Sequence, residues 1–86
     1  MRQESSFFEG HEPALLYIAK SLSDAKALEE FLTAEGIDYG VETDEYEGGV
    51  VFRRTRVGAF FYVLPDARPR VADLIRSRGF APSRVE

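Results

Sequence analysis

Apolar residues recur along the chain in two similar patterns, each a short continuous run followed by helical spacing. The first run covers residues 15–19 and the second covers residues 60–64. After each run, apolar side chains recur at intervals of three and four positions until a glycine, Gly36 or Gly79, ends the pattern. A short apolar run predicts a buried strand, and the helical spacing predicts an amphipathic helix that a left-handed glycine terminates. The pattern therefore predicts a strand-helix unit that occurs twice.

The polar segments between these units predict the remaining elements. Shorter strands are expected at residues 38–43 and 80–85, and the polar residues 44–49 predict a turn. Residues 50–56 fit either the return arm of a long hairpin or a separate short strand. Right-handed crossovers convert this β-α-β-β-α-β order into an α+β two-layer sandwich of the ferredoxin-like kind. We therefore expect a four-stranded antiparallel sheet with two helices on one face.

The length of 86 residues allows one hydrophobic core and therefore a single domain. Residues 1–13 are mostly polar and predict a flexible N-terminal arm, so the domain is expected to span residues 14–86. The longest apolar run is far shorter than the roughly 20 residues that cross a bilayer. The chain contains no cysteine, which is typical of a cytoplasmic protein. We expect a soluble cytoplasmic protein.

The two expected central strands are apolar on both faces. Side chains alternate between the faces of a strand, and a solvated face should carry polar residues at alternate positions. Because neither strand does so, we expect the face without helices to be covered by the arm, by a second subunit or by a ligand. The candidate residues for this surface are Leu15, Tyr17, Phe60, Tyr62 and Leu64, together with Phe7 and Phe8 of the arm. Which set the helices cover stays open at this point.

Charge is distributed unevenly around a net value of −4. Residues 24–47 contain nine acids and one base, whereas residues 53–84 contain eight arginines and two acids. The arginines at positions 53, 54 and 56 favour two interpretations. Either they bind a small anion or nucleotide together with the N-terminus of the first helix, or they protect an edge strand from aggregation. The candidate anion-binding residues are Arg53, Arg54, Arg56, Ser21 and Ser23.

Catalytic and metal-binding patterns find little support in this sequence. His11 is the single histidine and is flanked by Glu9 and Glu12, which is a poor ligand set without a second histidine or a cysteine. No Gly-x-Ser-x-Gly elbow occurs, and Gly48-Gly49 is not followed by the Lys-Ser/Thr of a phosphate loop. We expect no enzymatic activity, no metal and no cofactor.

RNA binding is an alternative because RNA-recognition motifs carry stacking aromatics on the corresponding central strands. The segment at residues 56–63 loosely resembles the longer of their two motifs, Lys/Arg-Gly-aromatic-Gly/Ala-Phe. However, Val57 replaces the first glycine, Gly58 replaces a stacking aromatic, and the negative net charge opposes phosphate binding. Single-stranded RNA is therefore a minor alternative.

One further resemblance covers about residues 15–78. The segments that carry it are Leu16-Tyr17-Ile18-Ala19, Ser23-Asp24-Ala25, Phe31-Leu32-x-Ala34-Glu35-Gly36-Ile37 and Tyr62-Val63-Leu64-Pro65-Asp66-Ala67. They resemble a small bacterial family of signal-transducing proteins of unknown function, which is related to PII regulators. The resemblance implies a ferredoxin-like fold and a regulatory role. No nucleotide-binding motif of PII regulators can be placed residue by residue on this chain.

Together these observations predict a small non-enzymatic binding or regulatory module that acts through protein-protein contacts. Self-association through the apolar sheet face, giving a homodimer, is the favoured interpretation of that face. A second contact is expected at the charged loop, because loops on rigid scaffolds commonly bind partners. Its candidate residues are Asp44, Glu45, Tyr46 and Glu47. A sensor of small anions or nucleotides is the main alternative.

Overall fold

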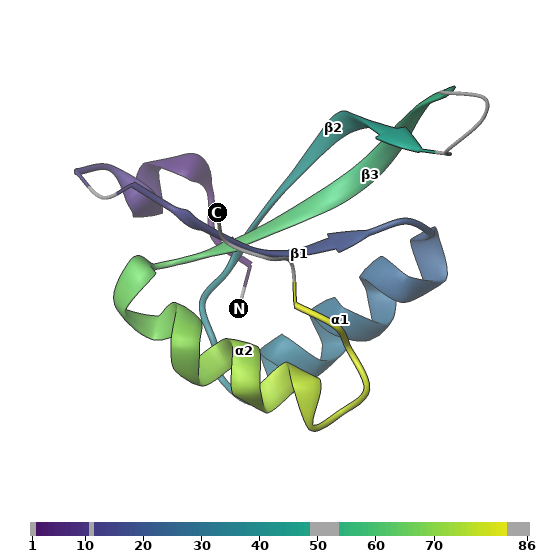
Figure 1. The fold of residues 1–86 in the computed structure, drawn as a ribbon. Coiled ribbons are helices and arrows are strands. Elements are labelled where there is room, and N and C mark those ends of the chain that lie inside the picture. The colour runs from purple at the N-terminus through teal and green to yellow at the C-terminus, as the bar shows by residue number, and fades with distance from the viewer. Residues whose placement is uncertain (1, 11, 49–53, 83–86) are drawn as a thin grey trace.

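The computed structural model describes residues 2–10, 12–48 and 54–82. In this part of the chain, an antiparallel sheet carries two α-helices on one face, and a short 3-10 helix lies on the other side (Figure 1). The sheet has the order β1-β3-β2. The elements are η1 (Ser5–Phe8), β1 (Ala14–Ala19), α1 (Leu22–Ala34), β2 (Gly40–Gly48), β3 (Arg54–Val63), η2 (Pro65–Ala67) and α2 (Arg68–Arg76).

The expected α+β architecture is confirmed, with three strands in the part of the chain that the structure describes. A strand was expected at residues 80–85, but residues 80–82, which the structure describes, do not form one. The rest of that expected strand lies outside the described residues.

Both helices end in the same way, as the repeated sequence pattern predicts. Gly36 and Gly79 adopt left-handed φ angles of 69° and 91°. The residue after each glycine, Ile37 or Phe80, donates its backbone N–H to the carbonyl five positions earlier, at 2.9 and 3.1 Å. This bond is that of the Schellman motif, which satisfies carbonyl groups that the helix leaves without partners. The two strand-helix units therefore share their closing turn.

The hairpin formed by β2 and β3 is longer than the sequence suggests. Its backbone pairing runs without interruption from Gly40↔Tyr62 to Gly48↔Arg54. The expectation of a turn at residues 44–49 was therefore wrong for residues 44–48, which belong to β2. Of the two interpretations of residues 50–56, the described residues 54–56 fit the return arm of a long hairpin, because they belong to β3. Local propensity favours a turn in an acidic segment, but the continuous backbone pairing with β3 supports the extended form. The hairpin extends past the last pair of β1, Ala19↔Ala59 (Figure 1).

A β-bulge in β1 changes which side chains face the helices. Leu15 pairs with Tyr62, and Tyr17 pairs with Phe61, so Leu16 is the extra residue between two consecutive positions of β3. Directly paired residues share a face, and an inserted residue shifts the alternation by one. Tyr17 therefore lies on the same face as the fully buried Phe61. The expectation that Tyr17 shares the open face with Leu15 was wrong, because strict alternation takes no account of a bulge.

The hydrophobic core fills the space between the sheet and the two helices. Its buried members are Leu16, Ala19, Ala25, Leu28, Leu32, Ile37, Tyr39, Phe61, Val63, Val71, Ala72 and Ile75. They come from all three described strands or their flanking residues and from both α-helices. This layer covers one face of the sheet and leaves the other to the N-terminal segment.

Candidate functional site

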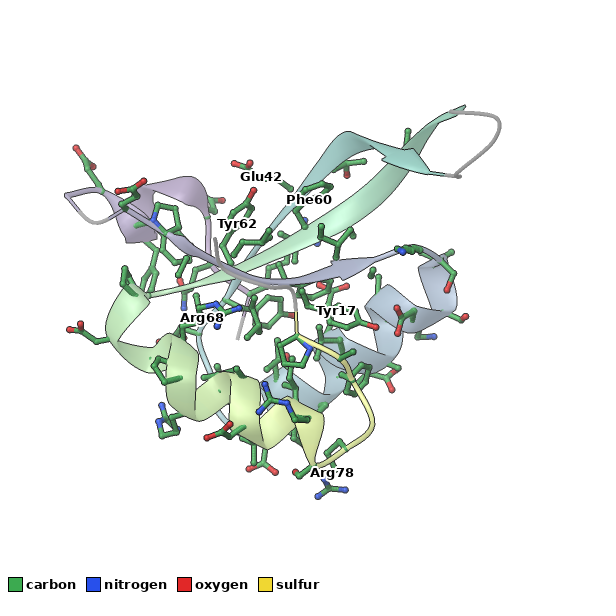
Figure 2. The ribbon with its side chains drawn as sticks, in the orientation of Figure 1. Tyr17, Glu42, Phe60, Tyr62, Arg68 and Arg78 are labelled. Carbon is green, nitrogen blue, oxygen red and sulfur yellow. The ribbon has the colours of Figure 1, made fainter. Side chains whose placement is uncertain are left out.

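The face of the sheet away from α1 and α2 is built from two rows of paired residues. The strand pairing places Leu15, Tyr62 and Gly40 in one row and Ile18, Phe60 and Glu42 in the next. We call these six residues the open face. Figure 2 shows Phe60, Tyr62 and Glu42 on the side of the sheet opposite the helices, whereas Tyr17 lies on the helix side. The four apolar and aromatic side chains are half-buried, and Glu42 is exposed.

The N-terminal segment covers one end of the open face. The ring of Phe8 lies against Gly40, where a Cβ atom would come within 2.7 Å of its Cε2 atom. Phe8 is 7% exposed and packs edge-to-face on the half-buried Phe7, with ring centroids 5.2 Å apart. An aromatic ring over a glycine of a sheet replaces the missing side-chain contacts of that glycine. The arm is therefore one cover of the open face, located at its Gly40 end.

The arm is tied to the chain just before β2 by backbone and side-chain contacts. The Gln3 backbone N–H donates to the Tyr39 carbonyl at 2.7 Å, and Arg2 forms a parallel bridge with Tyr39. The Gln3 side chain also donates to Asp38 Oδ1 at 2.9 Å. Arg2 lies 3.7 Å from Glu29 of α1. These contacts hold residues 2 and 3 beside the start of β2, and the arm continues from there to Phe8, whose ring lies on Gly40.

A groove lies between the arm and β2. Its volume is about 920 Å³, which is large enough for a side chain or a small ligand. Apolar surface comes from Phe8, Pro13, Val41 and Tyr62. Glu4 and Glu42 place carboxylates in its lining, and both residues are exposed. Arg2 also lines the groove, with its guanidinium 3.7 Å from the Glu29 carboxylate. The groove therefore combines apolar surface with two carboxylates and one arginine that is paired with α1.

Two tyrosine hydroxyls on the helix side donate to carboxylates of α1. Tyr17 donates to Asp24 Oδ2 at 2.7 Å, and Tyr39 donates to Glu29 Oε1 at 3.2 Å. Both rings contact Phe61, Tyr17 edge-to-face at 6.4 Å and Tyr39 stacked at 5.8 Å. Burial, and then the bond to Asp24, raise the pKa of Tyr17 to about 12. Burial also raises the pKa of Tyr39, with the nearby Glu29 adding to the effect. Both hydroxyls thus remain protonated donors that attach α1 to the sheet.

These contacts also explain a charged residue that interrupts the apolar stripe of α1. Glu29 stands beside Leu28 in a helix whose other inward positions are apolar. The structure places it between the Tyr39 hydroxyl and Arg2. Sequence periodicity gives no signal for this role, because both partners come from other elements.

The anion-binding hypothesis falls only partly within the described residues. Ser21 is the N-cap of α1, and its Oγ accepts the Asp24 N–H at 3.1 Å. Ser23 Oγ lies 3.4 Å from Ser21 Oγ. Arg53 and the side chains of Arg54 and Arg56 lie outside the described part. The structure therefore shows Ser21 as a helix cap, and the grouping of the five residues stays a prediction.

The other predicted residues are distributed as follows. The expected loop contact, Asp44, Glu45, Tyr46 and Glu47, belongs to the backbone of β2, and its side chains lie outside the described part. Leu64 follows β3 directly and is half-buried. His11 also lies outside the described residues. With Tyr17 on the helix side, the aromatics expected to stack RNA bases do not share one face.

Sequence reasoning missed three residues around the open face. Ile18 belongs to it because the bulge reverses the alternation after Leu15. Gly40 belongs to it because Phe8 needs the space. Arg68 of α2 donates from Nε to the Leu15 carbonyl at 2.7 Å, next to the bulge. The chain contains several other glycines and arginines, so the residue type alone did not indicate that Gly40 or Arg68 has this role.

Among the described residues, no group of three or more His, Asp or Glu side chains is placed to hold a metal ion. No helix in the described ranges has the length and apolar character that crossing a membrane requires. No family model, curated protein or solved structure matches this chain. The site is therefore defined by its geometry alone.

Proposed function

We propose that the protein is a non-enzymatic binding and regulatory module that acts through protein-protein contacts made by its open face. The observation that carries this proposal is the composition of the two rows. Leu15, Ile18, Phe60 and Tyr62 are apolar or aromatic on a face that neither α1 nor α2 covers. Aromatic side chains with a polar margin are typical of protein interfaces.

The occupant that we propose is a second copy of the chain, packed face to face. β3 is the middle strand, so a two-fold axis over it brings Phe60 and Tyr62 of the two copies together. Glu42 lies on the edge strand β2 and stays at the rim of such an interface, where its carboxylate keeps its water. The face is therefore self-complementary, with apolar residues at its centre and the charged residue at its margin.

Light scattering coupled to size exclusion, over a wide range of protein concentration, tests this proposal. We expect a dimer for the native chain and a monomer for Phe60→Glu. Leu22→Glu is a matched control, since Leu22 is 86% exposed at the start of α1 and away from the open face. Circular dichroism verifies that both variants fold, and Phe60→Ser serves as a milder second variant. A native protein that stays monomeric at millimolar concentration contradicts the proposal.

We also propose the ferredoxin-like arrangement for the complete sheet, with a further strand beside β1. The order β1-β3-β2 and the antiparallel pairing support it, since they fit three of its four strand positions. Amide hydrogen exchange tests this arrangement. Protection of the backbone at residues 83–85 is expected, and rapid exchange there contradicts it.

A further inference from the structure

Along the outer edge of β2, a row of backbone N–H and C=O groups points away from β3. β2 is an edge strand in the order β1-β3-β2. The arm reaches this side of the chain only at Tyr39, just before the strand begins. From Gly40 to Gly48, the described residues include no strand beside this edge.

This edge lacks most of the features that prevent pairing with another chain. Protective features include proline, charged side chains, bulges and a short strand, and β2 has the charged side chains in the form of its four acids. β2 contains no proline or lysine, spans nine residues and keeps a regular register with β3 throughout. The Gln3-Tyr39 hydrogen bond shows an extended segment already using the backbone on this side. The remaining ladder can therefore accept an extended peptide as an additional strand.

Charge indicates what kind of peptide fits. β2 contains four acids, Glu42, Asp44, Glu45 and Glu47, and no basic residue. The two arginines of β3 offset only half of these four negative charges, so the two strands of the hairpin together have a net charge of −2. Pairing β2 with β2 of a second copy would bring these acidic strands together, which is unfavourable. A segment rich in lysine or arginine has the complementary charge.

The groove beside the Gly40 end of β2 supplies a place for one side chain of such a peptide. Its apolar surface from Phe8 and Tyr62 suits the aliphatic stem of a lysine or arginine. Glu4 and Glu42 suit the cationic end, because they outnumber the one cation of the lining, Arg2, whose own carboxylate partner is Glu29. In strand addition, main-chain hydrogen bonds supply affinity and such pockets supply selectivity. We propose that the outer edge of β2 binds an extended basic peptide by strand addition, with a cationic side chain in this groove.

Titration with synthetic peptides tests the proposal. The probe is a nine-residue peptide of alternating lysine and valine. Its binding is measured at low salt from the ¹⁵N–¹H spectra of the labelled protein. We expect shifts centred on residues 40–48, and at least about tenfold weaker binding when alternate amides of the peptide are N-methylated. A glutamate-valine peptide of the same length should not bind. Equal binding of the N-methylated peptide would show charge attraction without strand pairing and would overturn the proposal.

Two protein variants separate this edge from the rest of the surface. Glu42→Lys should weaken binding of the lysine-valine peptide severalfold, whereas Glu30→Lys on the exposed side of α1 should change it little. Phe60→Glu, the variant that disrupts the proposed dimer, should still bind the peptide. This result separates a failure of the edge proposal from a failure of the open-face proposal. Shifts centred on β1, or no binding at millimolar peptide, also overturn the edge proposal.

Discussion

The Phe8 ring occupies the space that a side chain at position 40 would need. The Cβ of any residue other than glycine would lie 2.7 Å from Phe8 Cε2, well inside van der Waals contact. Gly40 has an ordinary φ angle, so the backbone itself would accept alanine. The glycine is therefore required by the arm, and the two residues depend on each other.

Gly40→Ala should displace Phe8 and lower the free energy of unfolding by about 1–3 kcal/mol, the usual cost of overpacking. The same substitution in a Phe8→Ala background should cost much less, because the clashing ring is gone. Urea denaturation of the four proteins in this double-mutant cycle measures the coupling between the two residues. Equal costs in both backgrounds would show that Phe8 does not rest on Gly40.

The Tyr39-Glu29 hydrogen bond should stabilise the attachment of α1 to the sheet. Glu29→Gln should cost about 1–2 kcal/mol, since it removes a charged acceptor from a buried tyrosine and from Arg2. Glu30→Gln is the matched control, because Glu30 is the exposed neighbour on the same helix. Its effect should stay within about 0.5 kcal/mol. Similar effects of the two substitutions in urea denaturation would argue against a specific role for Glu29.

Ionisation of Tyr17 should destabilise the fold in alkaline solution. Its folded-state pKa of about 12 lies above the ordinary value of 10.0, because burial and Asp24 disfavour the phenolate. The stabilising contribution is thus complete below pH 10 and is lost as pH rises towards 12. Melting temperatures measured from pH 8 to 12 should fall less steeply for Tyr17→Phe than for the native chain. An identical alkaline profile for both proteins would contradict this linkage.

The sequence was sufficient for features that depend on neighbouring residues along the chain. The closing turns at Gly36 and Gly79 follow from glycine placed before an apolar residue. Strand β1 and residues 59–63 of β3 follow from continuous apolar runs, whereas residues 54–58 of β3 do not belong to such a run. In the closing turns, the bonded atoms lie within five positions of one another, so the sequence pattern contains the physical cause.

The features that the sequence did not predict depend on contacts between distant segments. The bulge at Leu16 arises from how β1 meets β3, and it decides that Tyr17 faces the helices and Ile18 the open face. Similarly, the acidic β2 is extended because β3 lies beside it, whereas its own residues favour a turn. The sequence thus predicted an apolar open face, but which residues belong to it could be decided only from the strand register.

Arg68 should stabilise the bulge through its bond to the Leu15 carbonyl. A bulge interrupts the ladder of β1, and Arg68 Nε supplies a donor at 2.7 Å beside it. Arg68→Met keeps the aliphatic stem but removes the guanidinium group, so it should cost about 1–3 kcal/mol. Arg70→Met, two residues further along α2 at an exposed position, is the matched control and should have little effect.

Amide hydrogen exchange adds a readout that tests location as well as stability. If Arg68 holds the bulge, exchange in Arg68→Met should accelerate first in β1, while α1 keeps its protection. Because Leu15 and Ile18 belong to the open face, a loosened β1 should also weaken the proposed dimer in light scattering. Uniform acceleration throughout the chain would instead indicate that Arg68 contributes to global stability without a specific role at the bulge.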